Sequence, residues 1–194
     1  MLLCLFIIKD GVWVQGKPLL WKTLMAIDKI KTASKAARLS VVVVGGHPDD
    51  PASCCGGTIA RLADEGHHIA YLLLTGGEKG CHRQRGLACG LHRIRQARAS
   101  AKILGAERVA VVGQIDGETI FGHEQLLDFQ KALYGLRPDW VLTHWPLDSH
   151  ADHQVTSALT FQSWLNAPRP FRLYFYEAES GMQSSPGRSL TEIF

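Results

Sequence analysis

The chain lacks a long run of apolar residues and a strong excess of charge of either sign. Its first eight residues are apolar, but Lys9 and Asp10 end this run well short of the roughly 20 residues that a transmembrane helix needs. The run also lacks the basic start and the small-residue cleavage site of a signal peptide. The net charge of +3 is too small to indicate nucleic-acid binding. We therefore predict no transmembrane segment and no nucleic-acid partner.

The chain lacks a CxxC pair, and the spacing of its cysteines indicates neither a disulfide framework nor a metal site. The five cysteines are Cys4, Cys54, Cys55, Cys81 and Cys89. Cys54 and Cys55 are adjacent and badly placed to bridge each other. We therefore expect reduced thiols and a protein of a reducing compartment, the cytoplasm.

The composition is that of an ordinary globular protein. The 194 residues are enough for one domain with a substantial core, and 46% hydrophobic residues argue against disorder. We expect an N-terminal extension over residues 1–40 and one domain over residues 41–194. In the extension, Asp10-Gly11 favours a β-hairpin, and the apolar spacing over residues 19–37 favours an amphipathic helix. That helix is expected to pack on the domain, with membrane-surface binding as the alternative.

From residue 41 onward, strand and helix patterns alternate with little between them. The expected strands cover residues 41–44, 69–74, 109–112, 140–143 and 171–176, and the expected helices cover residues 54–64, 91–104, 125–134 and 153–165. This alternation is typical of a parallel sheet with helices on both faces. We therefore predict an α/β fold, a Rossmann-like three-layer sandwich with a mostly parallel sheet. A GxGxxG fingerprint is absent after the first strand, which disfavours a nicotinamide or flavin enzyme.

Two turns rich in histidine and aspartate follow two of the expected strands. Gly45-Gly46-His47-Pro48-Asp49-Asp50 follows the first strand, and Ser149-His150-Ala151-Asp152-His153 comes shortly after the fourth. Open parallel sheets bind ligands in the crevice beyond the carboxyl ends of their strands. We therefore expect the two turns to lie side by side in that crevice.

The residue types in these turns suit a metal ion. His47 and Asp50 lie three positions apart on a tight turn, and His153 can add a second nitrogen from across the crevice. Two histidines, one aspartate and a water molecule make up a catalytic zinc site with one open position. We predict that these three residues hold one Zn²⁺, although such ligands also accept other divalent metals. The alternative is a solvated turn pair, but two such groups after two strands favour the metal.

Three neighbouring residues have the chemistry for amide hydrolysis beside such a metal. Asp49 adjoins a ligand, points elsewhere and can act as a general base on water. His150 can stabilise a developing oxyanion or protonate the leaving amine, and Asp152 can orient the His150 ring.

The two turns resemble the signature motifs of the N-acetylglucosaminyl-phosphatidylinositol de-N-acetylase family, also called PIG-L or LmbE-like. Further segments resemble the family pattern in order, namely Gly57-Thr58-Ile59, Gly66-His67, Leu74-Thr75-Gly76-Gly77-Glu78, Leu104-Gly105 and the run from Pro138 to His144. The resemblance covers about residues 41–176. It implies a Rossmann-like fold, the three zinc ligands given above, Asp49 as base and His150 as acid or oxyanion stabiliser. It also implies that acetyl is removed from an N-acetylated amino sugar or its conjugate and that Arg93 contacts the substrate.

The chain departs from the family pattern at two places. Many family members carry Glu directly after the Asp pair, or one position later when Pro intervenes, where this chain has Pro51 and Ala52. Loss of a carboxylate that orients metal ligands commonly costs about 10 to 100-fold in affinity or activity. The family's Arg-x-x-Glu pattern also ends in Gln96 here.

The expected function is zinc-dependent hydrolysis of an N-acetyl amide on a small-molecule amino-sugar conjugate of the N-acetylglucosamine type. Two alternatives stay open: an amidase of thiol-sugar S-conjugates, and a catalytically decayed module that binds metal or sugar. His144 and Asp148 are either cleft residues or strand-end and turn residues. Trp145 either stacks on a sugar or packs in the core. The basic residues from Lys79 to Arg98 either face an anionic conjugate or are solvated, and the oligomeric state stays open.

Overall fold

The computed structural model describes residues 37–83 and 85–178. The hairpin and the amphipathic helix expected in the N-terminal extension lie outside these ranges, so both stay predictions, as does the domain boundary at residue 40. Within the described ranges, no helix is both long and apolar enough to cross a lipid bilayer.

Five parallel strands form one sheet in the order β3-β2-β1-β4-β5. The strands are β1 (Ser40–Gly45), β2 (His68–Thr75), β3 (Arg108–Gln114), β4 (Trp140–His144) and β5 (Arg172–Tyr176). The helices that connect them are α2 (Asp50–Asp64), α3 (Gly86–Ile103), α4 (His123–Gly135) and α5 (Ala151–Leu165). The predicted α/β fold with a parallel sheet is confirmed. All four helices begin earlier than predicted, α2 and α3 by four and five residues and α4 and α5 by two each.

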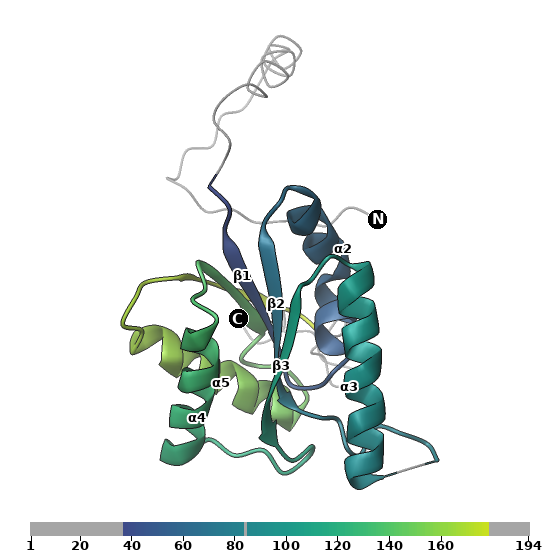
Figure 1. Ribbon diagram of the computed structural model, residues 1–194. Helices are drawn as coiled ribbons and strands as arrows, with labels where there is room; N and C mark the ends of the chain where they lie inside the picture. The colour runs from purple at the N-terminus through teal and green to yellow at the C-terminus, as the bar shows by residue number, and fades with distance from the viewer. Residues whose placement is uncertain (1–36, 84, 179–194) are drawn as a thin grey trace, which may run out of the picture. The chain divides into compact units, whose positions relative to one another are not determined.

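Helices cover both faces of the sheet, which explains the run of valines in β1. Successive side chains of a strand point to opposite faces. Alternate residues of Val41–Val44 therefore pack on Ile59 of α2 and Ala97 of α3 on one face, and on Phe129 of α4 and Leu159 of α5 on the other. Figure 1 shows α2 and α3 on one side of the strands and α4 and α5 on the opposite side. A strand buried on both faces is apolar throughout.

The strand order reverses between β1 and β4. From β1 the chain continues through α2 to β2 on one side, and it later returns through α4 to β4 on the other side of β1. Open α/β sheets bind their ligands at such a reversal, beyond the carboxyl ends of the strands. The loops after β1 and β4 both start there, so the fold brings the two predicted turns together.

A disulfide joins Cys81, in the loop after β2, to Cys89, in the first turn of α3. The prediction that all thiols are reduced is therefore wrong for this pair. Among the described cysteines, Cys54 and Cys55 are free. A disulfide needs Cα atoms within about 4.4–6.8 Å of each other. The path of the loop brings the Cα atoms of Cys81 and Cys89 to 5.9 Å, which is within this range. The spacing of the two cysteines in the sequence does not reveal that distance.

Candidate metal centre

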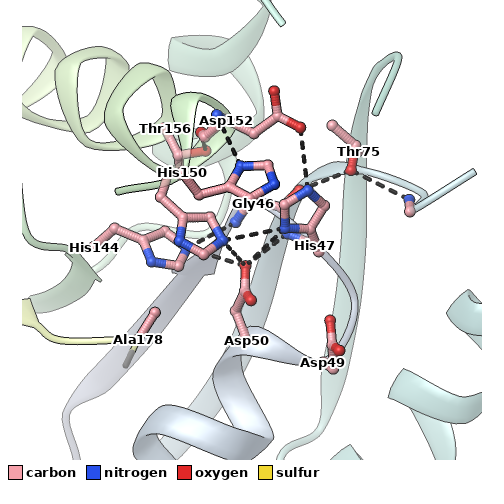
Figure 2. Close-up of polar contacts among 12 residues, drawn as sticks. Gly46, His47, Asp49, Asp50, Thr75, His144, His150, Asp152, Thr156 and Ala178 are labelled. Atoms are coloured by element: carbon pink, nitrogen blue, oxygen red, sulfur yellow. Dashed lines mark hydrogen bonds and ion pairs between the residues drawn. The ribbon is translucent and has the colours of Figure 1, made fainter. Parts of the chain in front are cut away.

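Three donor atoms, from His47, Asp50 and His153, converge where the strand order reverses. His47 Nδ1 lies 3.2 Å from His153 Nε2 and 3.6 Å from Asp50 Oδ2, and His153 Nε2 lies 3.4 Å from the same oxygen. Ligand atoms around a tetrahedral zinc, with bonds of about 2.0–2.2 Å, lie about 3.3–3.6 Å apart. The predicted ligands therefore have the spacing and the chemistry that one divalent cation requires. Figure 2 shows His47 and Asp50 facing each other.

Local structure holds these donors in place. Asp50 is the first residue of α2, and its Oδ2 accepts the backbone N–H of His47 at 2.7 Å. The positive end of the α2 dipole also favours a carboxylate at this position. His153 lies in the first turn of α5 and reaches across to Gly46, where a Cβ would lie only 3.0 Å from the His153 ring. Glycine at position 46 thus allows the close approach of the two turns.

Carboxylates hold the far side of the His47 ring. His47 Nε2 lies 3.1 Å from Asp152 Oδ2 and 3.3 Å from Asp116 Oδ1. A proton on Nε2 leaves the Nδ1 lone pair to face a cation. Burial disfavours the protonated ring, but Asp50, Asp116 and Asp152 outweigh it and raise the pKa of His47 to about 9. The carboxylates around His47 therefore favour positive charge at Nδ1, where a bound cation would replace the proton.

The Asp152 carboxylate contacts the His47 ring, and its expected role of orienting the His150 ring stays a prediction. Besides contacting His47, the carboxylate accepts from Thr119 Oγ1 at 2.7 Å and from the Gly117 backbone N–H at 2.8 Å. Asp152 contacts His150 through the backbone, because His150 is the N-cap of α5 and its Nδ1 accepts the Asp152 N–H at 3.2 Å. The neutral His150 ring therefore carries its proton on Nε2.

Two buried side chains, His144 and Asp148, contact the metal-donor residues Asp50 and His153. His144 Nε2 lies 3.0 Å from Asp50 Oδ2, and the His144 ring stacks on that of His153 with centroids 3.8 Å apart. Asp148 Oδ1 lies 3.1 Å from His153 Nδ1. Burial opposes ionisation of Asp50, yet His144 and His47 hold the pKa of its carboxyl well below the usual range. His144 and Asp148 thus both belong to the site. The position of His144 at the end of β4 is the feature of the sequence that indicates this.

Asp49 lies beside the cluster and outside its network of contacts, as Figure 2 shows. Its side chain is 66% exposed, and Oδ1 pairs with Arg93 Nη2 at 2.6 Å. The expected base and the expected substrate-contacting residue therefore form one ion pair. A pocket of about 400 Å³ opens beside this pair, and Ala52 and Gln96, where the chain departs from the family pattern, both line it.

Of the remaining candidates, Trp145 packs edge-on against Phe175, with ring centroids 5.9 Å apart. The indole is 38% exposed, so it lies against the outer strand β5 and not in the core. Of the basic residues after β2, Arg93 alone reaches Asp49, while Lys79 pairs with Glu118 at 2.9 Å.

Comparison with known proteins identifies the family. The family model described as PIG-L, GlcNAc-PI de-N-acetylase, matches residues 42–164. The chain belongs to this family, as the resemblance of its motifs predicts.

Three relatives illustrate the match. The chain is 34% identical over 128 residues to the diacetylchitobiose deacetylase of Thermococcus kodakarensis, covering 63% of this chain and 48% of that protein. It is 31% identical over 153 residues to the 1D-myo-inositol 2-acetamido-2-deoxy-alpha-D-glucopyranoside deacetylase of Segniliparus rotundus, covering 60% and 47%. The crystal structure of a conserved protein from Thermus thermophilus matches with a TM-score of 0.63 at 35% identity, covering 72% of this chain and 66% of that one. The chain thus spans about half the length of these two curated relatives.

Asp152→Asn is expected to weaken zinc binding by about 10 to 100-fold. The neutral amide is a poorer hydrogen-bond acceptor for the His47 ring than the carboxylate, so His47 Nδ1 becomes a weaker ligand for the metal. Competition with a chromophoric chelator measures the affinity. Asp128→Asn, which changes an exposed carboxylate on α4, is the matched control and should bind zinc as the unmodified chain does. Equal zinc affinity of the two variants would show that the Asp152 carboxylate does not support metal binding.

Proposed function

We propose that the chain hydrolyses the N-acetyl amide of a small amino-sugar conjugate, using one divalent cation, preferably zinc, held by His47, Asp50 and His153. The observation that carries this proposal is the convergence of the three donor atoms at 3.2–3.6 Å. Family membership supports it, since both curated relatives are named as deacetylases of N-acetylated sugars.

The chain's own residues divide the work of hydrolysis. Bound zinc would supply a Lewis acid that polarises a carbonyl and lowers the pKa of water. Asp49, largely exposed next to the ligand Asp50, takes the proton of the attacking water. His150, whose ring centroid lies 4.8 Å from that of His47, uses Nε2–H to stabilise the developing oxyanion, and the proton that Asp49 takes from the water passes to the leaving amine. Arg93 holds the Asp49 carboxylate and contacts the substrate.

The pocket supports a substrate of modest size. Its volume of about 400 Å³ is near the small end of the range of about 300–1,000 Å³ for ligand sites. Asp49 and Arg93 line this pocket together with small or neutral residues of α2 and α3, namely Ala52, Ser53, Gln96 and Ala97. A single amino sugar with a small substituent would place its amide beside the base.

The test is acetate release by the zinc-loaded chain from N-acetylglucosamine, N,N′-diacetylchitobiose and an N-acetylglucosaminyl inositol. A thiol-sugar S-conjugate is assayed in parallel for cleavage of its amide. Acetate released from an amino sugar supports the proposal, and cleavage of the S-conjugate alone favours the amidase. Bound zinc with neither reaction favours the decayed binding module.

A further inference from the structure

Two residues of α3, Cys89 and Arg93, hold the same loop from the same face of the helix. They lie four positions apart, which places their side chains one above the other. Cys89 is bonded to Cys81 of the loop after β2, and its sulfur lies 3.3 Å from the carbonyl oxygen of Gly77. Arg93 Nη1 donates to that same oxygen at 3.4 Å. The disulfide and the guanidinium thus fix neighbouring points of one loop.

The loop encloses the guanidinium of Arg93 closely. A Cβ built on Gly77, or one built on Gly80, would overlap Arg93 Nη1. Gly77 also has a φ of +70°, a conformation that a residue with a side chain rarely adopts. The Arg93 side chain is only 15% exposed as a result. Because the backbone at both glycines lies against the same guanidinium nitrogen, we expect a shift of the loop to move Arg93.

The second terminal nitrogen of the Arg93 guanidinium, Nη2, pairs with Asp49 Oδ1 at 2.6 Å. A continuous series of contacts therefore runs from the disulfide through the loop of residues 77–81 to Arg93 and on to Asp49. We propose that the Cys81–Cys89 disulfide is a positioning element of the active site, which keeps Arg93 on Asp49, and that the oxidised chain is the fully active form. This inference rests on the proposed function for the roles of Arg93 and Asp49.

Other contacts keep the loop folded when the disulfide is absent. The Lys79 backbone N–H donates to Asp116 Oδ2 at 2.8 Å, and the Gly86 N–H donates to the Glu78 carbonyl at 3.0 Å. Asp116 also contacts His47, so this anchor belongs to the metal side of the loop. Reduction should therefore loosen the end of the loop that carries Cys81 and leave the metal centre intact.

The redox step is an exchange with a dithiol. Dithiothreitol donates two electrons and two protons, the bond between the two sulfurs breaks, and Cys81 and Cys89 become thiols while the reagent closes to its own cyclic disulfide. The cross-link no longer limits the conformations of the loop. Because a misplacement of about 1 Å in a catalytic site can cost about 100-fold in rate, kcat/KM should fall by up to that factor.

A double-mutant cycle tests the coupling between the disulfide and Arg93. One variant carries Cys81→Ser with Cys89→Ser, a second carries Arg93→Lys, and a third combines them. We expect the combination to lose no more kcat/KM than the worse of the two, because both changes break the same arrangement. Dithiothreitol should convert the unmodified chain to the activity of the serine variant, leave that variant unchanged, and act reversibly on reoxidation. Zinc content should not change. Losses that multiply in the combined variant would overturn the proposal.

A second measurement does not depend on activity. The ¹⁵N side-chain NMR signal of Arg93, assigned by its loss in Arg93→Lys, should be distinct in the oxidised chain and should move to the position of exposed arginines on reduction. An Arg93 signal that is the same in both states would overturn the proposal, whatever the chain catalyses. A signal that responds to reduction in a chain that releases no acetate supports the positioning role and counts against the proposed function alone.

Discussion

Asp49→Asn should lower kcat for acetate release by about 10² to 10⁴-fold and leave the bound metal in place. The asparagine amide matches the size of the carboxylate but cannot take a proton from water. The Asp49 carboxylate pairs with Arg93, whereas the metal ligands face one another next to it. Activity and metal content should therefore separate in this variant. Acetate release and metal analysis of the same sample measure both.

The control for this experiment is Asp128→Asn, the exposed carboxylate on α4, which should keep both properties. An Asp49→Asn chain with unchanged kcat would show that another group takes the proton. Loss of stoichiometric metal from Asp49→Asn would instead make Asp49 part of the metal centre. Either outcome contradicts the assignment of Asp49 as the general base.

Asp50→Asn should abolish both metal binding and acetate release. Asp50 Oδ2 is the oxygen that both histidine donors approach, at 3.6 Å and 3.4 Å, and it is the anionic member of the set. Without its charge, the affinity for zinc should fall by more than the factor of about 100 that marks the loss of a residue which only orients a ligand. Chelation of the unmodified chain should have the same effect on activity, and added zinc should restore the chelated chain only.

Loss of folding is the competing explanation for an inactive Asp50→Asn chain. Removal of one partner from a buried, charged cluster can cost about 3–5 kcal/mol of stability. Thermal unfolding followed by circular dichroism tells whether the variant is folded at the assay temperature. A folded Asp50→Asn chain that keeps one tightly bound zinc would contradict the ligand assignment.

The sequence predicts the secondary-structure order well because the sheet is buried on both faces. Val41–Val44 is apolar throughout, and helices alternate with such strands, which leaves little choice of fold class. The start of α2 was less predictable, since Asp50-Pro51 reads as part of a turn. The helix begins at Asp50 because proline is tolerated in a first helical turn, where its missing N–H breaks no hydrogen bond.

The sequence predicts the site residues that lie within the two histidine-rich turns, but not the contacts that other loops make with them. His47, Asp50 and His153 follow strand ends, and parallel strands bring their ends to one edge of the sheet. Partners of the Asp152 carboxylate lie in the segment after β3, at Gly117 and Thr119, which has no motif that points to it. That contact depends on how three loops meet, and one sequence does not specify it.

The disulfide has a consequence for the predicted location. The cytoplasm was predicted because the thiols were expected to be reduced. Disulfides are rare in cytosolic proteins and persist mainly in oxidising compartments. Since Cys81 and Cys89 are joined, that prediction has lost its basis.

The most direct test of the metal centre is a crystal structure of the zinc-loaded chain with anomalous data collected at the zinc absorption edge. We expect one peak within about 2.0–2.2 Å of His47 Nδ1, Asp50 Oδ2 and His153 Nε2, with the Asp49 carboxylate outside that bonding distance. A peak held by other side chains, or an Asp50 carboxylate that turns away from both histidines, would contradict the account.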